Sequence, residues 1–105
     1  MAVVSLLVVS GSLAFAQAQA VRIVEGSSSD INSWGYEPAS LTVRAGQPVT
    51  FTNTGAQAHT ATATGVFDTG LLGTGESATI TVATPGTYEY HCTPHPWMRA
   101  SLVVM

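Results

Sequence analysis

The sequence predicts an all-β domain, arranged as an antiparallel sandwich or barrel, from three observations. No stretch between residues 21 and 105 keeps a helical period, short segments alternate apolar and polar residues, and turn-forming residues separate these segments at intervals of about ten residues. A chain of 105 residues has room for one domain. We expect strands over residues 21–25, 40–44, 49–53, 77–82, 87–92 and 101–105.

Alternation and turn residues define the earlier strands. Residues 21–25 are expected to open the folded domain, and an irregular loop follows over 27–35. Leu41 and Val43 then alternate with polar neighbours before an Ala-Gly turn, and Phe51 continues the pattern until Asn-Thr-Gly ends it.

The later strands follow the same rule. The strand over 77–82 places its apolar side chains on one face, and a Thr-Pro-Gly turn separates it from the next strand. That next strand places Tyr88, Tyr90 and Cys92 on one face, and the last strand closes the domain.

Composition excludes several classes of protein. Only 9% of the residues are charged while 46% are hydrophobic, so the chain is not a charge-rich disordered protein. A net charge of −3 with three arginines and no lysine argues against nucleic-acid binding. The single cysteine excludes a disulfide within the chain.

The first 20 residues differ from the rest. They hold no charged side chain, begin with an apolar run and end in an alanine-rich tail with small-x-small cleavage patterns. We expect residues 1–20 to be a signal peptide and residues 21–105 to be the exported domain, in the periplasm or otherwise outside the cytoplasm. The alternative is that residues 1–20 are retained, as a membrane anchor or as a core strand.

Most of the reactive side chains lie in one segment near the C-terminus. Cys92, His95 and Met98 are spaced three residues apart on a single loop, and His59 follows an earlier strand. Two imidazoles, a thiolate and a weak thioether are typical of blue-copper electron-transfer sites. Zinc favours a fourth strong ligand, which a thioether is not.

Strand direction brings these residues together. The strand over 49–53 leads toward His59, and the strand over 87–92 ends at Cys92, so both run toward one end of the sandwich. The strand over 77–82 then runs the opposite way, which places residues 71–76 at the same end. Prolines on both sides of His95 stiffen the ligand loop.

His91 is interpreted as structural. Alternation turns it to the face opposite Cys92. A second copper centre at His91 would need further histidines, and the chain holds three in all.

The segment TPGTYEYHCTPHPWM, preceded by AHTATATGVFDTGLLGTGES, resembles the cupredoxins, and within them the amicyanin and plastocyanin group. The resemblance implies a Greek-key β-sandwich of about eight strands with one type 1 copper bound by His59, Cys92, His95 and Met98. Thr60 stands where relatives commonly have Asn, and we expect its N–H or hydroxyl to steady the thiolate.

The resulting hypothesis is a small exported protein, not an enzyme, that carries single electrons between redox partners through a Cu(I)/Cu(II) couple. The alternative is a copper carrier or storage protein with the same ligands. An enzyme with Cys92 as nucleophile and His95 as base is disfavoured, because no third group orients the pair and Met98 is left unexplained.

We expect redox partners to dock at the metal end of a monomer. His95 should be the ligand nearest solvent, and apolar side chains should surround its edge. These side chains are Leu71, Leu72, Pro94, Pro96 and Trp97.

Overall fold

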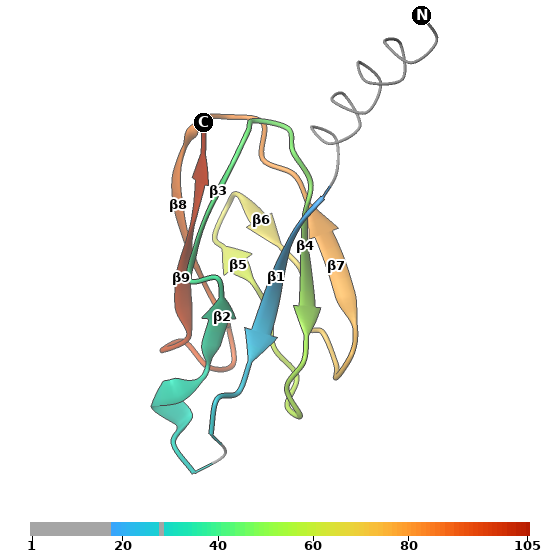
Figure 1. Cartoon of the computed structure of the whole chain (residues 1–105), viewed down its shortest axis with the longest axis vertical. Helices are drawn as coiled ribbons and strands as arrows, with labels where there is room; N and C mark the ends of the chain where they lie inside the picture. The colour runs from blue at the N-terminus through green and yellow to red at the C-terminus, as the bar shows by residue number, and fades with distance from the viewer. Residues whose placement is uncertain (1–17, 28) are drawn as a thin grey trace, which may run out of the picture.

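The computed structural model describes residues 18–27 and 29–105, which form two β-sheets packed face to face (Figure 1). The described residues hold nine strands and one short 3₁₀ helix. In chain order these elements are β1 (Gln19–Val24), η1 (Ile31–Ser33), β2 (Gly35–Glu37), β3 (Ser40–Val43), β4 (Val49–Asn53), β5 (Thr62–Ala63), β6 (Phe67–Asp68), β7 (Ser77–Ile80), β8 (Gly86–His91) and β9 (Arg99–Val104). The predicted β-sandwich is confirmed.

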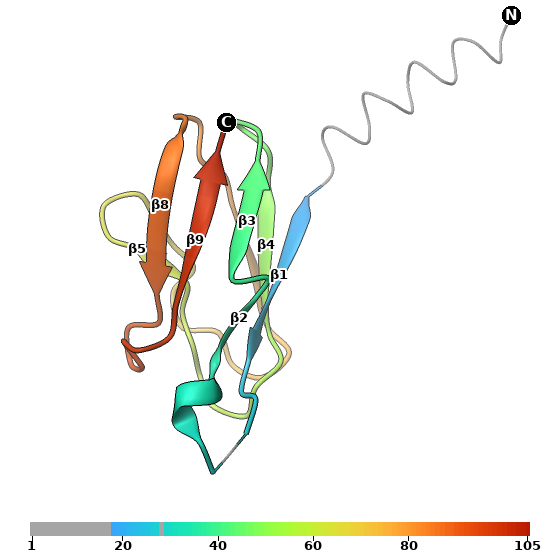
Figure 2. The same cartoon turned by 60° about the vertical axis from the view of Figure 1, so that its left-hand side comes forward.

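The two sheets have the strand orders β2-β1-β4-β7 and β3-β9-β8-β5-β6. In Figure 2 the layer that contains β8 and β9 stands apart from β1. The expectation of purely antiparallel sheets is wrong, since β1 pairs in parallel with β4 and β3 pairs in parallel with β9. Alternation along a strand shows which side chains face the core, but it carries no information about which strand lies alongside.

The core fills the space between the sheets. Ile23 and Phe51 from one sheet and Tyr90 and Leu102 from the other are at most 2% exposed. The Phe51 ring meets the Tyr90 ring edge-on at 5.4 Å between centroids and stacks on Phe67 at 6.0 Å. These aromatic contacts join the two sheets and fix their separation.

The segment expected to be irregular over 27–35 contains ordered structure. Asp30 caps η1 by accepting a hydrogen bond from the Asn32 N–H at 3.1 Å, and Gly35 begins β2 opposite Val24 of β1. A helix of three residues is too short to leave a hydrophobic period in the sequence, so the pattern indicated only the loop in which it lies.

The first strand begins slightly before the expected residue 21. Gln19 and Ala20 already pair with β4, so β1 begins two residues before Val21. Residues 1–17 of the expected signal peptide lie outside the described residues, and that assignment stays a prediction. Across residues 18–27 and 29–105, no helix has the length and apolar character needed to cross a lipid bilayer.

Phe51→Ala is expected to lower the free energy of unfolding by about 3–5 kcal/mol, because it opens a cavity where the two sheets meet. Val66→Ala is the matched control, since Val66 is 46% exposed and its truncation should change stability by less than about 0.5 kcal/mol. Urea unfolding followed by circular dichroism measures both. Equal losses in the two variants would show that Phe51 does not join the sheets.

Candidate metal centre

Cys92 directly follows β8, where the chain enters a tight loop that ends at Met98. The His95 N–H donates to the Cys92 carbonyl at 3.2 Å, and the Met98 N–H donates to the His95 carbonyl at 2.9 Å. The Cys92 N–H closes the loop on the Met98 carbonyl at 3.2 Å. Cys92 and Met98 are fully buried, while His95 between them is partly exposed, as expected for the ligand nearest solvent.

His59 reaches the same end of the molecule on the connection between β4 and β5, which belong to different sheets. It lies beyond β4 and exchanges two backbone hydrogen bonds with Leu72, at 3.1 and 2.8 Å. The buried amide of Asn53, at the end of β4, donates to the carbonyls of Gln57 and Leu72 at 2.7 and 2.8 Å. Asn53 therefore fixes the loop that carries His59, whose side chain is fully buried.

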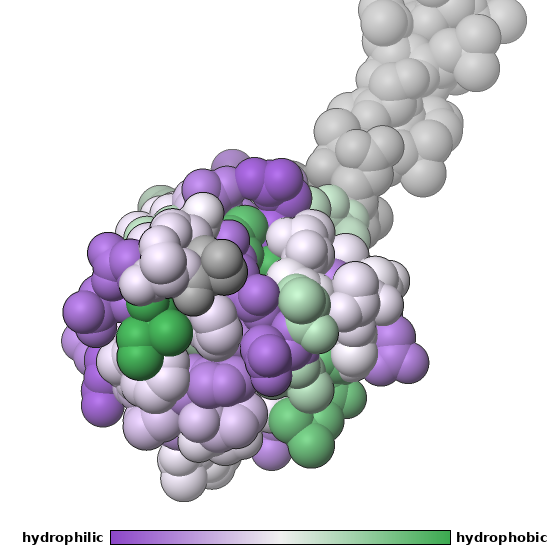
Figure 3. Space-filling model, turned by 90° about the horizontal axis from the view of Figure 1, so that it is seen from below, coloured by the Kyte–Doolittle hydropathy of each residue, from purple (hydrophilic) through white to green (hydrophobic). Residues whose placement is uncertain are grey.

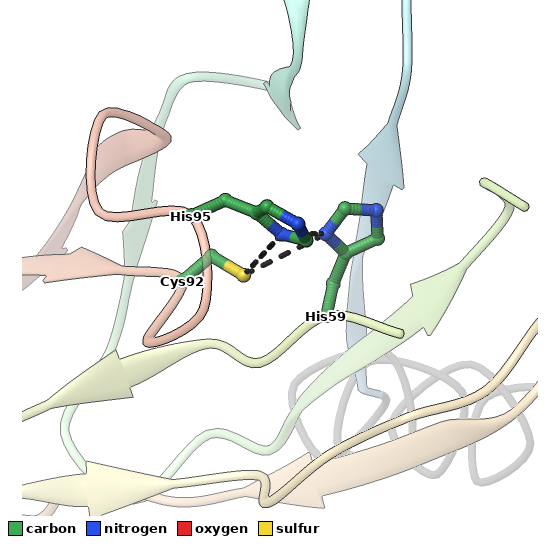
Figure 4. Close-up of side chains that lie close together, drawn as sticks. All are labelled: His59, Cys92 and His95. Carbon is green, nitrogen blue, oxygen red and sulfur yellow. Dashed lines mark hydrogen bonds between the residues drawn. The ribbon is translucent and has the colours of Figure 1, made fainter. Parts of the chain in front are cut away.

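Three potential ligand atoms converge between these segments (Figure 4). The Cys92 sulfur lies 3.6 Å from His59 Nδ1 and 3.4 Å from His95 Nδ1, and the two nitrogens are 3.1 Å apart. A triangle with these sides has a centre about 2 Å from each corner, which is the length of a metal–nitrogen bond and slightly short of a metal–sulfur bond. The side chains therefore fit one metal ion held by two nitrogens and one sulfur.

Thr60 supports the thiolate position through its backbone. Its N–H points to the Cys92 sulfur at 3.4 Å, so the expected N–H contact is present. The hydroxyl instead accepts from the Thr93 N–H at 3.0 Å and contacts the Thr62 hydroxyl at 2.8 Å. Thr60 thereby ties the His59 segment to the Cys92 loop.

Burial dominates the electrostatics of the ligands. It raises the pKa of the Cys92 thiol, although the N–H groups of Thr60 and His95 oppose it. Burial, together with the adjacent His59 ring, lowers the pKa of His95. A metal ion that binds here must therefore displace a proton from sulfur, while His95 already favours its neutral, metal-binding form.

Aromatic rings cover the outer side of the centre. The Trp34 ring lies edge-on to His59 and His95, at centroid distances of 5.7 and 5.4 Å. Trp97 is 41% exposed, lies 5.3 Å from the His95 ring and donates its indole N–H to the Ile31 carbonyl at 2.7 Å. Nothing in the sequence pattern pointed to Trp34, because it acts through a contact between distant segments.

The expected docking residues are exposed with one exception. Leu71 is 66% exposed, and Pro94, Pro96 and Trp97 are exposed as well. Leu72 is only 6% exposed, so its assignment to the surface was wrong. Its backbone pairs with His59, which turns its side chain into the core and leaves Leu71 outside.

Glu25, which sequence reasoning missed, lies on the side of the His59 ring that faces away from Cys92 and His95. It directly follows β1, and its Oε2 atom is 2.6 Å from His59 Nε2 and accepts the Gln57 N–H at 2.9 Å. Burial favours a higher pKa for Glu25, but the Gln57 N–H and the His59 ring outweigh it, and the pKa falls below its ordinary value.

His91 lies apart from these residues. It pairs with Thr62 of β5 and is half-buried. Among residues 18–27 and 29–105, the one group of His, Cys, Asp and Glu side chains close enough to share a metal ion is His59, Cys92 and His95.

The family model for the cupredoxin-like domain matches residues 1–104. This chain belongs to the cupredoxin-like family. It is 36% identical over 85 residues to amicyanin from Paracoccus denitrificans, covering 71% of this chain and 62% of that protein. It is also 36% identical over 108 residues to chloroplastic plastocyanin from Physcomitrium patens, covering 87% of this chain and 61% of that protein. This cupredoxin thus spans about three fifths of the length of these two relatives.

Solved structures agree with the family. A purple cupredoxin from Nitrosopumilus maritimus superposes with a TM-score of 0.75 at 25% identity, covering 83% of this chain and 99% of that one. A reduced tryptophan-to-tyrosine variant of amicyanin gives a TM-score of 0.70 at 32% identity, covering 84% and 82%. The family and the N₂S donor set together identify copper as the cofactor of this cupredoxin.

Proposed function

We propose that this cupredoxin is a small exported blue copper protein that carries single electrons between redox partners. The observation that carries the proposal is the convergence of one sulfur and two imidazole nitrogens within 3.1–3.6 Å, beside a fully buried methionine on the same loop. When bound, copper supplies a one-electron couple between Cu(I) and Cu(II). Export rests on the composition of residues 1–20 as a cleavable signal peptide.

Each of four residues has a role in this proposal. Cys92 supplies the strong thiolate ligand, and His59 and His95 supply imidazole nitrogens. Met98 would supply a weak thioether ligand that tunes the reduction potential rather than holding the metal. The loop hydrogen bonds and the buried surroundings keep these side chains in place and exclude water, so little has to move when an electron arrives or leaves.

Electrons are proposed to enter and leave through His95, the ligand on the solvent side. The docking face consists of the exposed Ile31, Leu71, Pro94, Pro96 and Trp97. Figure 3 looks onto this end of the sandwich and shows strongly hydrophobic residues in separate places, with neutral and polar residues between them. Such a face suits small, transient redox complexes, in which a few apolar anchors suffice.

Adding Cu(II) to the metal-free protein should give one bound equivalent and an intense blue colour from thiolate-to-copper charge transfer. Cys92→Ser should abolish the colour because it removes the chain's only thiolate, while circular dichroism stays unchanged. Thr93→Ser, at the exposed neighbouring position, is the control and should remain blue. A colourless wild-type protein that prefers zinc would overturn the proposal, and rapid transfer of Cu(I) to an acceptor would favour a copper carrier instead.

Met98→Gln should keep copper bound but lower the reduction potential, because an amide oxygen stabilises Cu(II) relative to Cu(I) more than a thioether does. We expect a shift of about 60 mV or more, equivalent to a tenfold change in the Cu(I)/Cu(II) ratio. Met105→Gln is the control, since Met105 is 72% exposed and lies at the chain end. Spectroscopic redox titration measures both, and equal potentials in the two variants would remove Met98 from the ligand set.

Leu71→Lys and Trp97→Ala should slow electron self-exchange between reduced and oxidised copies about tenfold, a barrier increase of about 1.4 kcal/mol. The reason is that two docking faces must meet, and a lysine or a lost aromatic ring weakens that contact. Val66→Lys introduces the same charge at an exposed valine in the β5–β6 turn and should leave the rate unchanged. NMR line broadening gives the rates. An unaltered rate in both docking variants would place the contact elsewhere.

A further inference from the structure

The His59 ring is held from both of its nitrogens. Nδ1 faces the Cys92 sulfur and His95, whereas Nε2 faces the Glu25 carboxylate at 2.6 Å. Because a carboxylate only accepts hydrogen bonds, Nε2 carries the hydrogen. The lone pair of the neutral ring is then on Nδ1, which points toward the metal position.

The Glu25 carboxylate is itself fixed in place. Its side chain is 12% exposed, and the same Oε2 atom that meets His59 accepts the Gln57 N–H at 2.9 Å. Gly55 leaves the space for it, because a Cβ atom at that position would lie 2.5 Å from Oε2. Gly55 and the Gln57 N–H therefore hold the Glu25 carboxylate where it contacts the His59 ring.

Other contacts already hold this part of the fold together. Ile23 pairs with Asn53 across β1 and β4, and the Thr54 N–H donates to the Ile23 carbonyl at 3.0 Å. Glu25 is thus not needed to attach β1 to the loop that carries His59. What it adds is a fixed hydrogen-bond acceptor and a negative charge directly behind a metal ligand.

We propose that Glu25 is a positioning residue for His59, which fixes the tautomer that presents Nδ1 to copper and whose negative charge stabilises Cu(II) over Cu(I). This inference rests on the proposed copper site. Carboxylates behind metal-bound histidines orient the ring and make it a stronger donor, and a nearby negative charge favours the more positive oxidation state. Glu25 therefore lowers the reduction potential of this chain.

Glu25→Gln in the copper-loaded full chain separates charge from orientation. The glutamine amide oxygen still accepts from Nε2 and from Gln57, so the ring should keep its place and the blue absorption band its position. The Cu(I)/Cu(II) ratio at a given potential should rise about tenfold, a shift of about 60 mV toward higher potential. Glu25→Asp, which retains the charge, should recover part of this shift, and Glu89→Gln, which removes an exposed carboxylate from β8, should cause none.

Metal affinity provides a readout that does not depend on electron transfer. Glu25→Ala should weaken Zn²⁺ binding about 10–100-fold in a chelator competition, because the His59 ring loses its anchor. Gly55→Ala tests the contact between Glu25 and His59 without changing either residue. Its methyl group should displace the Glu25 carboxylate and, like Glu25→Gln, raise the reduction potential.

The outcomes distinguish this inference from the proposed function. An unchanged potential in Glu25→Gln with unchanged Zn²⁺ affinity in Glu25→Ala would overturn the positioning role while leaving the copper site intact. A wild-type protein that binds no copper would instead overturn the proposed function. A shift in Glu89→Gln as large as that in Glu25→Gln would show a general charge effect, and the proposal would fail.

Discussion

The short separations between the sulfur of Cys92 and the ring nitrogens of His59 and His95 are the constraint on which the rest of the structure depends. His59 lies on the connection between β4 of one sheet and β5 of the other, and Cys92 directly follows β8, so the geometry of the centre depends on how the two sheets pack. The stacked and edge-on rings of the core set the spacing of the sheets. Since protein interiors are close-packed and resist compression, the core transmits its rigidity to the ligand atoms.

A second requirement is that buried polar groups near the centre have partners. The Asn53 side chain donates from its nitrogen to two backbone carbonyls and accepts a backbone N–H on its oxygen. The Thr60 N–H donates to the Cys92 sulfur, and the Thr60 hydroxyl accepts the Thr93 N–H. Left unpaired, each group would cost about 1–3 kcal/mol. The same bonds that meet this requirement also determine where the ligand loops lie, so the polar network sets the geometry of the site.

The sequence could predict features that depend on neighbouring residues in the chain, but not contacts between residues far apart in it. The Cys92–His95–Met98 spacing is local, and a period of two identifies the faces of β4 and β8, so loop and strands were predictable. The parallel pairing of β1 with β4 and the contact of Glu25 with His59 join residues far apart in the chain, and no local pattern encodes them. Hydropathy likewise does not distinguish Leu71 from Leu72, whereas the backbone pairing of Leu72 with His59 does.

The two histidines have unlike surroundings. His59 is fully buried and backed by Glu25, while His95 is partly exposed and lies beside Trp97. The segment from β1 to β2 supplies Glu25 against His59 Nε2 and Trp34 against both rings, although it contributes none of the proposed ligands. This segment therefore contacts the surroundings of both histidines: Glu25 accepts a hydrogen bond from His59, and the Ile31 carbonyl accepts the indole N–H of Trp97, which lies beside His95.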